Sequence, residues 1–123
     1  MTIYHWYRIE TTTVLGFPDM IGIAPQMDTV FCEIKVARSG RVKFSPHQIA
    51  MAKRLSEQSN NCYYVIVYDE LAKPLHGGGE ILYGARNVDN LQKNMKNEPR
   101  LAVGWPKIQE YLVKFHGKRA ENQ

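Results

Sequence analysis

The sequence predicts a single domain of mixed α/β class, on the border with α+β, in which a mixed sheet of four to five strands is flanked by helices. Three observations support this. Short runs rich in aromatic and β-branched residues recur along the chain, as expected of strands. Segments with apolar residues at helical spacing lie between and after them. With 123 residues, 44% of them hydrophobic and 23% charged, the chain suits one ordinary core and is too short for two domains.

The first strands are predicted in the N-terminal third of the chain. Residues 4–12 are rich in aromatic and β-branched types, which favours a strand or long ribbon. Residues 20–24 and 29–36 are two apolar runs separated by the turn-like sequence Pro25-Gln26-Met27-Asp28. We expect these two runs to pair as a hairpin.

A helix is predicted over residues 46–58, because its first turn carries the appropriate signals. Ser45 suits the N-cap, Pro46 the first position and Gln48 the third position, where its side chain can complete a capping box. The apolar stripe that would face the sheet consists of Ile49, Met51, Ala52 and Leu55.

The second half of the chain, from residue 62 onward, is predicted to contain two strands, a Gly-rich loop and two helices. Cys62–Tyr68 is a continuous apolar run, typical of a central strand covered on both faces. A Gly-rich loop is expected at 76–79 and a short last strand at 80–83. Residues 87–95 give a weak helical pattern and residues 106–115 a better one. We expect the domain to cover residues 1–116, with residues 117–123 as a loose polar tail.

Charge is distributed unevenly along the chain. The net charge of +4, from 16 Lys+Arg and 12 Asp+Glu, is too small a bias to identify a partner. Residues 35–54, however, contain basic and no acidic side chains, and Asp19 and Glu33 stand just upstream. Two acids beside a basic field suit a polyanion held near a metal; a solvated positive loop and helix face is the alternative. The basic residues are Lys35, Arg38, Arg41, Lys43, Lys53 and Arg54.

The cysteines and the apolar runs exclude other classes of protein. Cys32 and Cys62 lie inside apolar runs without metal-ligand spacing, so we expect them to be reduced and buried. No apolar run approaches the roughly 18 residues that span a bilayer, and the first residues lack the layout of a signal peptide. We therefore expect a cytoplasmic protein without a membrane partner.

The strongest chemical signal is the pair Glu33 and Lys35 together with Asp19. Side chains alternate along a strand, so Glu33 and Lys35 project from one face and Ile34 from the other. If the hairpin forms, Asp19 comes close to both. Mg²⁺ prefers a few carboxylate oxygens plus waters and phosphate, and a lysine can orient or activate the attacking water. The alternative is a Glu and a Lys on a solvent face and an Asp in a turn after Pro18.

Three segments in register resemble a known family. They are residues 16–23, which contain Gly16 and Pro18-Asp19, residues 31–36, which contain Glu33-Ile34-Lys35, and, at the start of the expected helix, Phe44-Ser45-Pro46-His47-Gln48. This order resembles the PD-(D/E)XK nuclease superfamily in its VRR-NUC and Holliday-junction-resolvase-like form. The resemblance spans residues 6–69 and implies a restriction-endonuclease-like fold.

The resemblance also implies roles for individual residues. Asp19 and Glu33 would bind Mg²⁺ or Mn²⁺, helped by the Ile34 carbonyl, and Lys35 would serve the attacking water. Gln48 would lie beside the site, although a capping box alone also explains it. Family members carry a further acidic residue on an N-terminal helix. Here Glu10 is the only acid before Asp19, so it is either that third ligand or an inert strand residue.

The implied partner is DNA. Candidate contacts are the basic residues from Arg38 to Arg54 together with His47, which stands beside Gln48. The sequence at Gly77-Gly78-Gly79 is not a phosphate loop, so no nucleotide cofactor is expected. Tyr4, Trp6 and Tyr7 would either stack on bases, support a homodimer or pack in a half-buried strand.

The leading hypothesis is a structure-selective or weakly sequence-selective DNA endonuclease, because so small a domain has little surface for reading a long site. Branched, flapped or junction DNA as substrate, and a phage or mobile-element origin, rest on family analogy. Two alternatives remain open. One is a DNA-binding module without catalysis, and the other is an inhibitor or accessory protein that acts on another protein.

Overall fold

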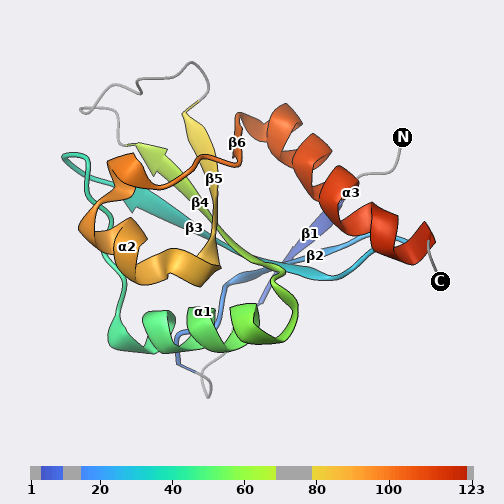
Figure 1. Cartoon of the computed structure of the whole chain (residues 1–123), viewed down its shortest axis with the longest axis horizontal. Coiled ribbons are helices and arrows are strands. Elements are labelled where there is room, and N and C mark those ends of the chain that lie inside the picture. Colours follow the sequence, from blue (N-terminus) through green and yellow to red (C-terminus); the bar gives the residue numbers. More distant parts are fainter. Residues whose placement is uncertain (1–3, 10–14, 69–78, 122–123) are drawn as a thin grey trace.

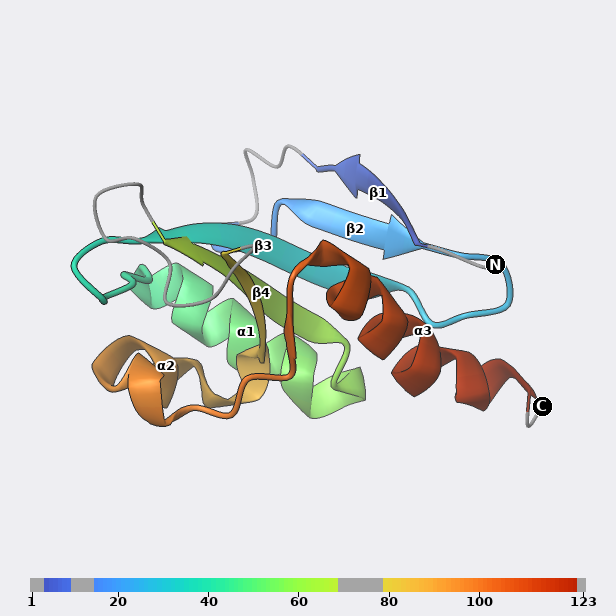
Figure 2. The ribbon, with the colours of Figure 1, turned by 90° about the horizontal axis from the view of Figure 1, so that it is seen from above.

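The computed structural model describes residues 4–9, 15–68 and 79–121 of the chain. These residues form one mixed sheet of six strands with three α-helices, and the strands follow one another across the sheet in chain order (Figures 1 and 2). The mixed α/β class is confirmed, whereas four to five strands were too few. The strands are β1 (His5–Arg8), β2 (Met20–Ile23), β3 (Val30–Ala37), β4 (Cys62–Tyr68), β5 (Glu80–Gly84) and β6 (Ala102–Val103). The helices are α1 (Pro46–Ser59), α2 (Val88–Lys93) and α3 (Trp105–Glu121).

The sheet is antiparallel except at its centre. β2 and β3 form the predicted hairpin, with Met20 opposite Cys32. β3 and β4 are parallel, and α1 makes the crossover between them. Parallel neighbours need a crossover of this kind, so the helix starts beyond the carboxyl end of β3 and returns to the amino end of β4. That connection places the start of α1 beside the residues of β3.

Two hydrophobic cores lie on the two faces of the sheet. On one face, α1 and α2 pack Ala52, Val88 and Leu91 against β4 and β5. On the other face, α3 packs Ile108 and Leu112 against the opposite side chains of the strands. Figure 1 shows α1 and α3 on opposite sides of the strands. Alternation along each strand therefore decides which helix a side chain meets.

α1 begins as its sequence predicts. The Ser45 hydroxyl accepts a hydrogen bond from the Gln48 backbone N–H at 3.1 Å, and the Gln48 side chain accepts one from the Ser45 N–H at 2.9 Å. This completes the capping box. The helix ends at Ser59, because Asn60 adopts the left-handed conformation with φ of 52°. Ala52 is buried, and Ile49 and Leu55 pack beside it.

β4 is the central strand that its apolar run predicts. It pairs with β3 on one side and with β5 on the other. Residues 62–66 are all buried, with side chains alternating between the two cores. The neighbouring cysteines are free and buried, as expected, but Cys32 faces the α3 side and Cys62 faces the α1 side.

The C-terminal half departs from the prediction in two elements. β6 follows the strand that we expected to be last; it has only two residues, too few for a periodic pattern, and forms by pairing with β5. α3 continues past Phe115 to Glu121, so the helix is longer than predicted. The polar composition of residues 117–121 gives no sign of this extension. The helix is held in place there by buried His116 and by Gly117, which lies against Met27.

The remaining predictions are met in part. β1 is confined to His5–Arg8, and residues 10–14 lie outside the described part of the chain. The expected Gly-rich loop falls almost wholly on residues 69–78, which are also outside it. The weak helix is shortened to Val88–Lys93, with a 3₁₀ turn on each side. None of the described helices is both long and apolar enough to cross a membrane.

Candidate functional site

Glu33 and Lys35 point to the α1 face of β3, and Ile34 between them points to the α3 face. Alternation requires this arrangement, and the burial agrees with it. The Glu33 side chain is 10% exposed and the Lys35 side chain 21% exposed, although both carry charge. Charged groups are rarely buried to this extent without partners, so their contacts decide what the site can do.

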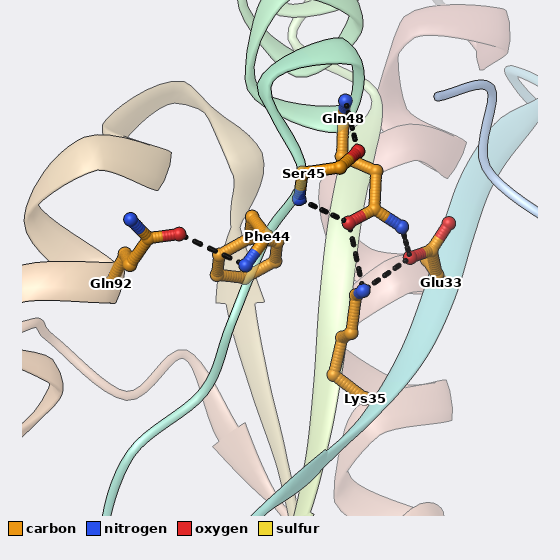
Figure 3. Close-up of polar contacts among 6 residues, drawn as sticks. All are labelled: Glu33, Lys35, Phe44, Ser45, Gln48 and Gln92. Carbon is orange, nitrogen blue, oxygen red and sulfur yellow. Dashed lines mark hydrogen bonds and ion pairs between the residues drawn. The ribbon is translucent and has the colours of Figure 1, made fainter. Parts of the chain in front are cut away.

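The partners come from the first turn of α1 (Figure 3). Gln48 donates from Nε2 to Glu33 Oε2 at 2.6 Å, and its Oε1 accepts from Lys35 Nζ at 2.8 Å. Lys35 Nζ lies 3.3 Å from the same Glu33 oxygen. The three side chains therefore form a closed triangle. Gln48 completes the helix cap and contacts the acidic residue at the same time, so the two roles considered for it coexist.

Asp19 approaches the triangle from the end of the hairpin. Met20 is opposite Cys32, so the same register continued by one residue sets Asp19 opposite Glu33. Directly opposed residues in an antiparallel pair present their side chains on one face, about 5 Å apart. Asp19 Oδ1 is buried and has no hydrogen-bond partner among the described residues. An orphaned buried oxygen of this kind is costly unless a ligand or water satisfies it.

The electrostatic environment raises the pKa of Glu33. Burial has the largest effect, because it disfavours the charged form. The Lys35 ammonium opposes this and lowers the pKa, both by its charge and by its hydrogen bond, while the negative charge of Asp19 raises it further. The effect of Asp19 on the pKa of Glu33 agrees with the placement of the two residues opposite each other across the hairpin.

The loop before Asp19 is fitted closely to the start of α1. Gly16 has φ of +80°, and a Cβ atom there would lie 2.2 Å from the His47 carbonyl oxygen. Only glycine allows both the conformation and the approach. The triangle and Asp19 thus gather where α1 begins, and the N-terminus of a helix favours negative charge nearby.

The carboxylates of Asp19 and Glu33 fit Mg²⁺ or Mn²⁺, which complete their coordination with water, better than a metal ion whose ligands all come from protein side chains. Within the described part of the chain, no group of three or more His, Cys, Asp and Glu side chains could hold a metal ion. Mg²⁺ needs less than this, because it commonly uses one or two carboxylates and completes its shell with waters and phosphate. Asp19 and Glu33 supply two carboxylates, and the buried Asp19 Oδ1 lacks a partner. These residues therefore fit a bound Mg²⁺ or Mn²⁺ ion.

The resemblance implies two further ligands, Glu10 and the Ile34 carbonyl. Glu10 lies outside the described residues. Ile34 is on β3 opposite Val65, with its side chain 38% exposed on the α3 face. Its backbone lies between Glu33 and Lys35 in the chain. The carbonyl role stays a prediction.

The residues predicted to contact DNA are exposed, and one of them, Lys53, is paired with an acidic side chain. Arg38 and Arg41 pair through their backbones across a tight turn at the end of β3. Lys43 and His47 are exposed on the way into α1. Lys53 is bound instead to Asp89 of α2, at 2.5 Å. The remaining candidate, Arg54, is exposed in the middle of α1.

Sequence reasoning missed the residues that support the triangle from outside. The Phe44 ring centroid lies 5.4 Å from Lys35 Nζ and 4.6 Å from the ring of Tyr64. The Phe44 backbone N–H donates to Gln92 Oε1 at 2.9 Å, and Gln92 belongs to α2 (Figure 3). Phe44 was visible just before the cap, but nothing in the sequence signals Gln92.

A second polar cluster lies on the opposite face, at the end of α3. His116 Nε2 is 2.6 Å from the Tyr63 hydroxyl, and its Nδ1 is 3.4 Å from Asp28 Oδ2. The His116 side chain is only 4% exposed. This cluster joins α3 to β4 and to the β2–β3 turn, which agrees with a packing histidine.

No protein-family model matches this chain, and no curated protein or solved structure does so. The resemblance in the three motifs is therefore not supported by an overall match. The site stands on its own geometry.

A hollow of about 980 Å³ lies away from this site, between β6 and α3. Apolar side chains, among them Val103, Tyr111 and Val113, form much of its lining. Glu33 and Lys35 do not line it, so the candidate site is identified by its polar contacts and not by a cavity.

Proposed function

We propose that the chain is a metal-dependent nuclease that hydrolyses phosphodiester bonds in DNA. The observation that carries the proposal is the meeting of Glu33, Lys35 and Gln48 beside Asp19 at the start of α1. It supplies two carboxylates, one ammonium group and a helix N-terminus around a single point. A restriction-endonuclease-like arrangement is the finer form of the fold that we propose with it.

Each residue has a distinct role in the proposed reaction. Asp19 and Glu33 would hold Mg²⁺ or Mn²⁺, with the Ile34 carbonyl as an additional ligand. When bound, the cation polarises the phosphate and lowers the pKa of a water molecule. Lys35 would orient that water or stabilise the charge that develops on the phosphate. Gln48 would hold the Glu33 carboxylate in its orientation through the 2.6 Å hydrogen bond.

The DNA backbone would lie along the exposed basic residues that precede α1. Arg38, Arg41 and Lys43 follow β3 directly, and His47 is in the first turn of the helix. Contacts of this type bind phosphates and are weakened by salt. A domain of this size suits the recognition of DNA shape, so we favour branched, flapped or junction substrates. Symmetrical cutting of two strands would need a homodimer. We expect the chain to act in the cytoplasm.

The proposal is tested by cleavage of labelled duplex, flapped, four-way-junction and single-stranded DNA with Mg²⁺, Mn²⁺ or EDTA. The wild type is compared with Glu33→Ala and Lys35→Ala. Glu110→Gln is a matched control, because Glu110 is an exposed acid on α3 that pairs with nearby Lys107. Cutting that needs the metal, survives in the control and is lost in both site variants is the expected result. An inactive wild type on every substrate would contradict catalysis.

One observation favours a second candidate, a DNA-binding module without catalysis. Lys35 and Gln48 already bind Glu33 Oε2, so the triangle is stable as a purely structural device. In that case the wild type and both site variants bind DNA equally well and none of them cuts it. The cleavage experiment therefore separates the two candidates when DNA binding is measured in parallel.

A further inference from the structure

Two neighbouring backbone N–H groups at the entrance to α1 are each held by a glutamine side chain. The Ser45 N–H donates to Gln48 Oε1 at 2.9 Å, and the Phe44 N–H donates to Gln92 Oε1 at 2.9 Å. The first bond is the local capping box. The second joins α2 to the chain just before the helix, across 48 positions of sequence.

Phe44 connects this second bond to the charged groups. Its side chain is 7% exposed and packs edge-on against Tyr64, the residue of β4 that lies opposite Glu33. The Lys35 ammonium lies over the same ring, 5.4 Å from its centroid. A shift of Phe44 would therefore move the surface against which Lys35 rests, and it would move Ser45, to which Gln48 is bonded.

We propose that Gln92 of α2 is a positioning residue for the Glu33–Lys35–Gln48 triangle, acting through Phe44. Among the described residues, no hydrogen bond or ion pair joins Gln92 to any of the three side chains, so its effect passes through the Phe44 backbone and ring. The proposal rests on the proposed function for its kinetic consequence, but its geometric consequence can be measured without any activity. It also gives α2 a part in the site, whose other residues lie just before β2, on β3 and on α1.

α2 offers an internal control for simple docking of the two helices. Asp89 stands three residues before Gln92, so both lie on the same side of the helix. Asp89 binds Lys53 of α1 at 2.5 Å, well past the first turn. Loss of the Asp89 contact would loosen α2 from α1 without releasing Phe44. If Gln92 served only to dock α2, the two losses would have the same consequence.

The variants are chosen to change one property at a time. Gln92→Met keeps the length and a similar helix propensity but removes the hydrogen-bond acceptor. Gln92→Glu keeps an acceptor oxygen for the Phe44 N–H and is the conservative rescue. Asp89→Asn removes the charge that pairs with Lys53 and leaves Gln92 in place.

In the cleavage assay we expect Gln92→Met to lower kcat about tenfold, with KM changed less than about twofold, since loss of one positioning bond misorients the reacting groups. Gln92→Glu should recover most of kcat, and Asp89→Asn should keep the wild-type value. A Gln92→Met variant with wild-type kcat, or an equal loss in Asp89→Asn, would overturn the proposal.

The geometric test uses NMR spectra of the same proteins without metal or DNA. We expect Gln92→Met to shift the side-chain amide signals of Gln48 and the Lys35 methylene signals that lie near the Phe44 ring. Asp89→Asn should leave both unchanged. If only the Phe44 amide moves in Gln92→Met, the positioning claim fails, whatever the activity. If the wild type cuts no DNA but these shifts appear, the nuclease proposal fails and the positioning claim stands.

Discussion

Two polar clusters lie on opposite faces of one sheet, and each joins a helix to a strand. Around Glu33, the start of α1 meets β3. Around His116, the end of α3 meets β4 and the β2–β3 turn. They differ in access to solvent, because the Lys35 side chain is 21% exposed and the His116 side chain only 4%. They also differ in composition, since two neighbouring carboxylates are found only in the first.

This difference distinguishes a candidate binding site from a cluster that only packs a helix against the sheet. In the His116 cluster, Tyr63 and Phe115 lie edge-on to the imidazole, and the His116 side chain is only 4% exposed. The Glu33 cluster has a carboxylate whose pKa is raised by burial, and beside it the orphaned oxygen of Asp19. A buried polar group without a partner is a candidate for a bound ion or water. The Glu33 cluster therefore suits ligand binding, and the His116 cluster suits packing.

The largest expected effect is the loss of activity in Glu33→Gln. The amide keeps the shape but removes the charge that would bind the cation, so we expect cleavage to fall about 1,000-fold or more. Stability should not fall, because the variant no longer holds a buried carboxylate whose pKa is raised. Initial rates and urea unfolding check the two parts. A variant that keeps wild-type cleavage would mean that Glu33 has no catalytic part.

The opposite pattern is expected at the other cluster. His116→Ala leaves the Tyr63 hydroxyl without its 2.6 Å partner and opens a cavity in the α3 face. We expect a loss of about 3 kcal/mol in the free energy of unfolding, with kcat unchanged. Tyr63→Phe, which removes only the hydroxyl, should cost about 1 kcal/mol. A fall in kcat without a fall in stability would show that the comparison between the clusters is wrong.

Much of this contrast follows from sequence, but not all of it. Alternation predicted that Glu33 and Lys35 share a face, and the hairpin that brings Asp19 opposite Glu33 was predicted from two apolar runs. The capping box predicted α1, because that signal is local. β6, by contrast, exists only by pairing with β5.

The contacts that sequence could not supply are those made between distant helices and strands. Gln92 is an ordinary polar residue of α2, and its bond to Phe44 depends on how α2 packs. The burial of His116 likewise depends on how α3 packs against β4. The extension of α3 beyond Phe115 was also missed, because residues 117–121 are polar and the burial of His116 is seen only in the packed structure.

A smaller effect separates the two roles of Gln48. Ser45→Ala removes the hydroxyl that accepts from the Gln48 backbone N–H but leaves the Gln48 side-chain bond to Glu33. Gln48→Ala keeps that backbone N–H but removes the side-chain bond to Glu33 and the other half of the capping box, in which Gln48 Oε1 accepts from the Ser45 N–H. We expect each variant to lose about 1 kcal/mol of stability. Cleavage should fall about tenfold in Gln48→Ala only. Thermal unfolding and initial rates of both variants check this. An equal loss of activity in Ser45→Ala would indicate that Gln48 acts through the cap alone.

The smallest effect is the dependence of stability on pH in EDTA. The pKa of Glu33 is raised in the folded protein, so between its ordinary value and the raised value the folded state binds more protons than the unfolded state. The contribution of Glu33 to stability therefore falls as pH rises through this window. We expect the difference in unfolding free energy, wild type minus Glu33→Gln, to become more negative with rising pH. A difference that becomes more positive would mean that Lys35 outweighs burial.

The central claim is that Asp19 and Glu33 hold a divalent cation at the start of α1. Paramagnetic broadening of backbone amide NMR signals by Mn²⁺ tests it most directly, and needs neither substrate nor activity. We predict that sub-stoichiometric Mn²⁺ broadens the signals around Asp19, Glu33 and the first turn of α1, that Mg²⁺ reverses this, and that Glu33→Gln weakens it. Signals around His116 should stay sharp. Equal broadening of both clusters, or none at Asp19 and Glu33, would contradict the account.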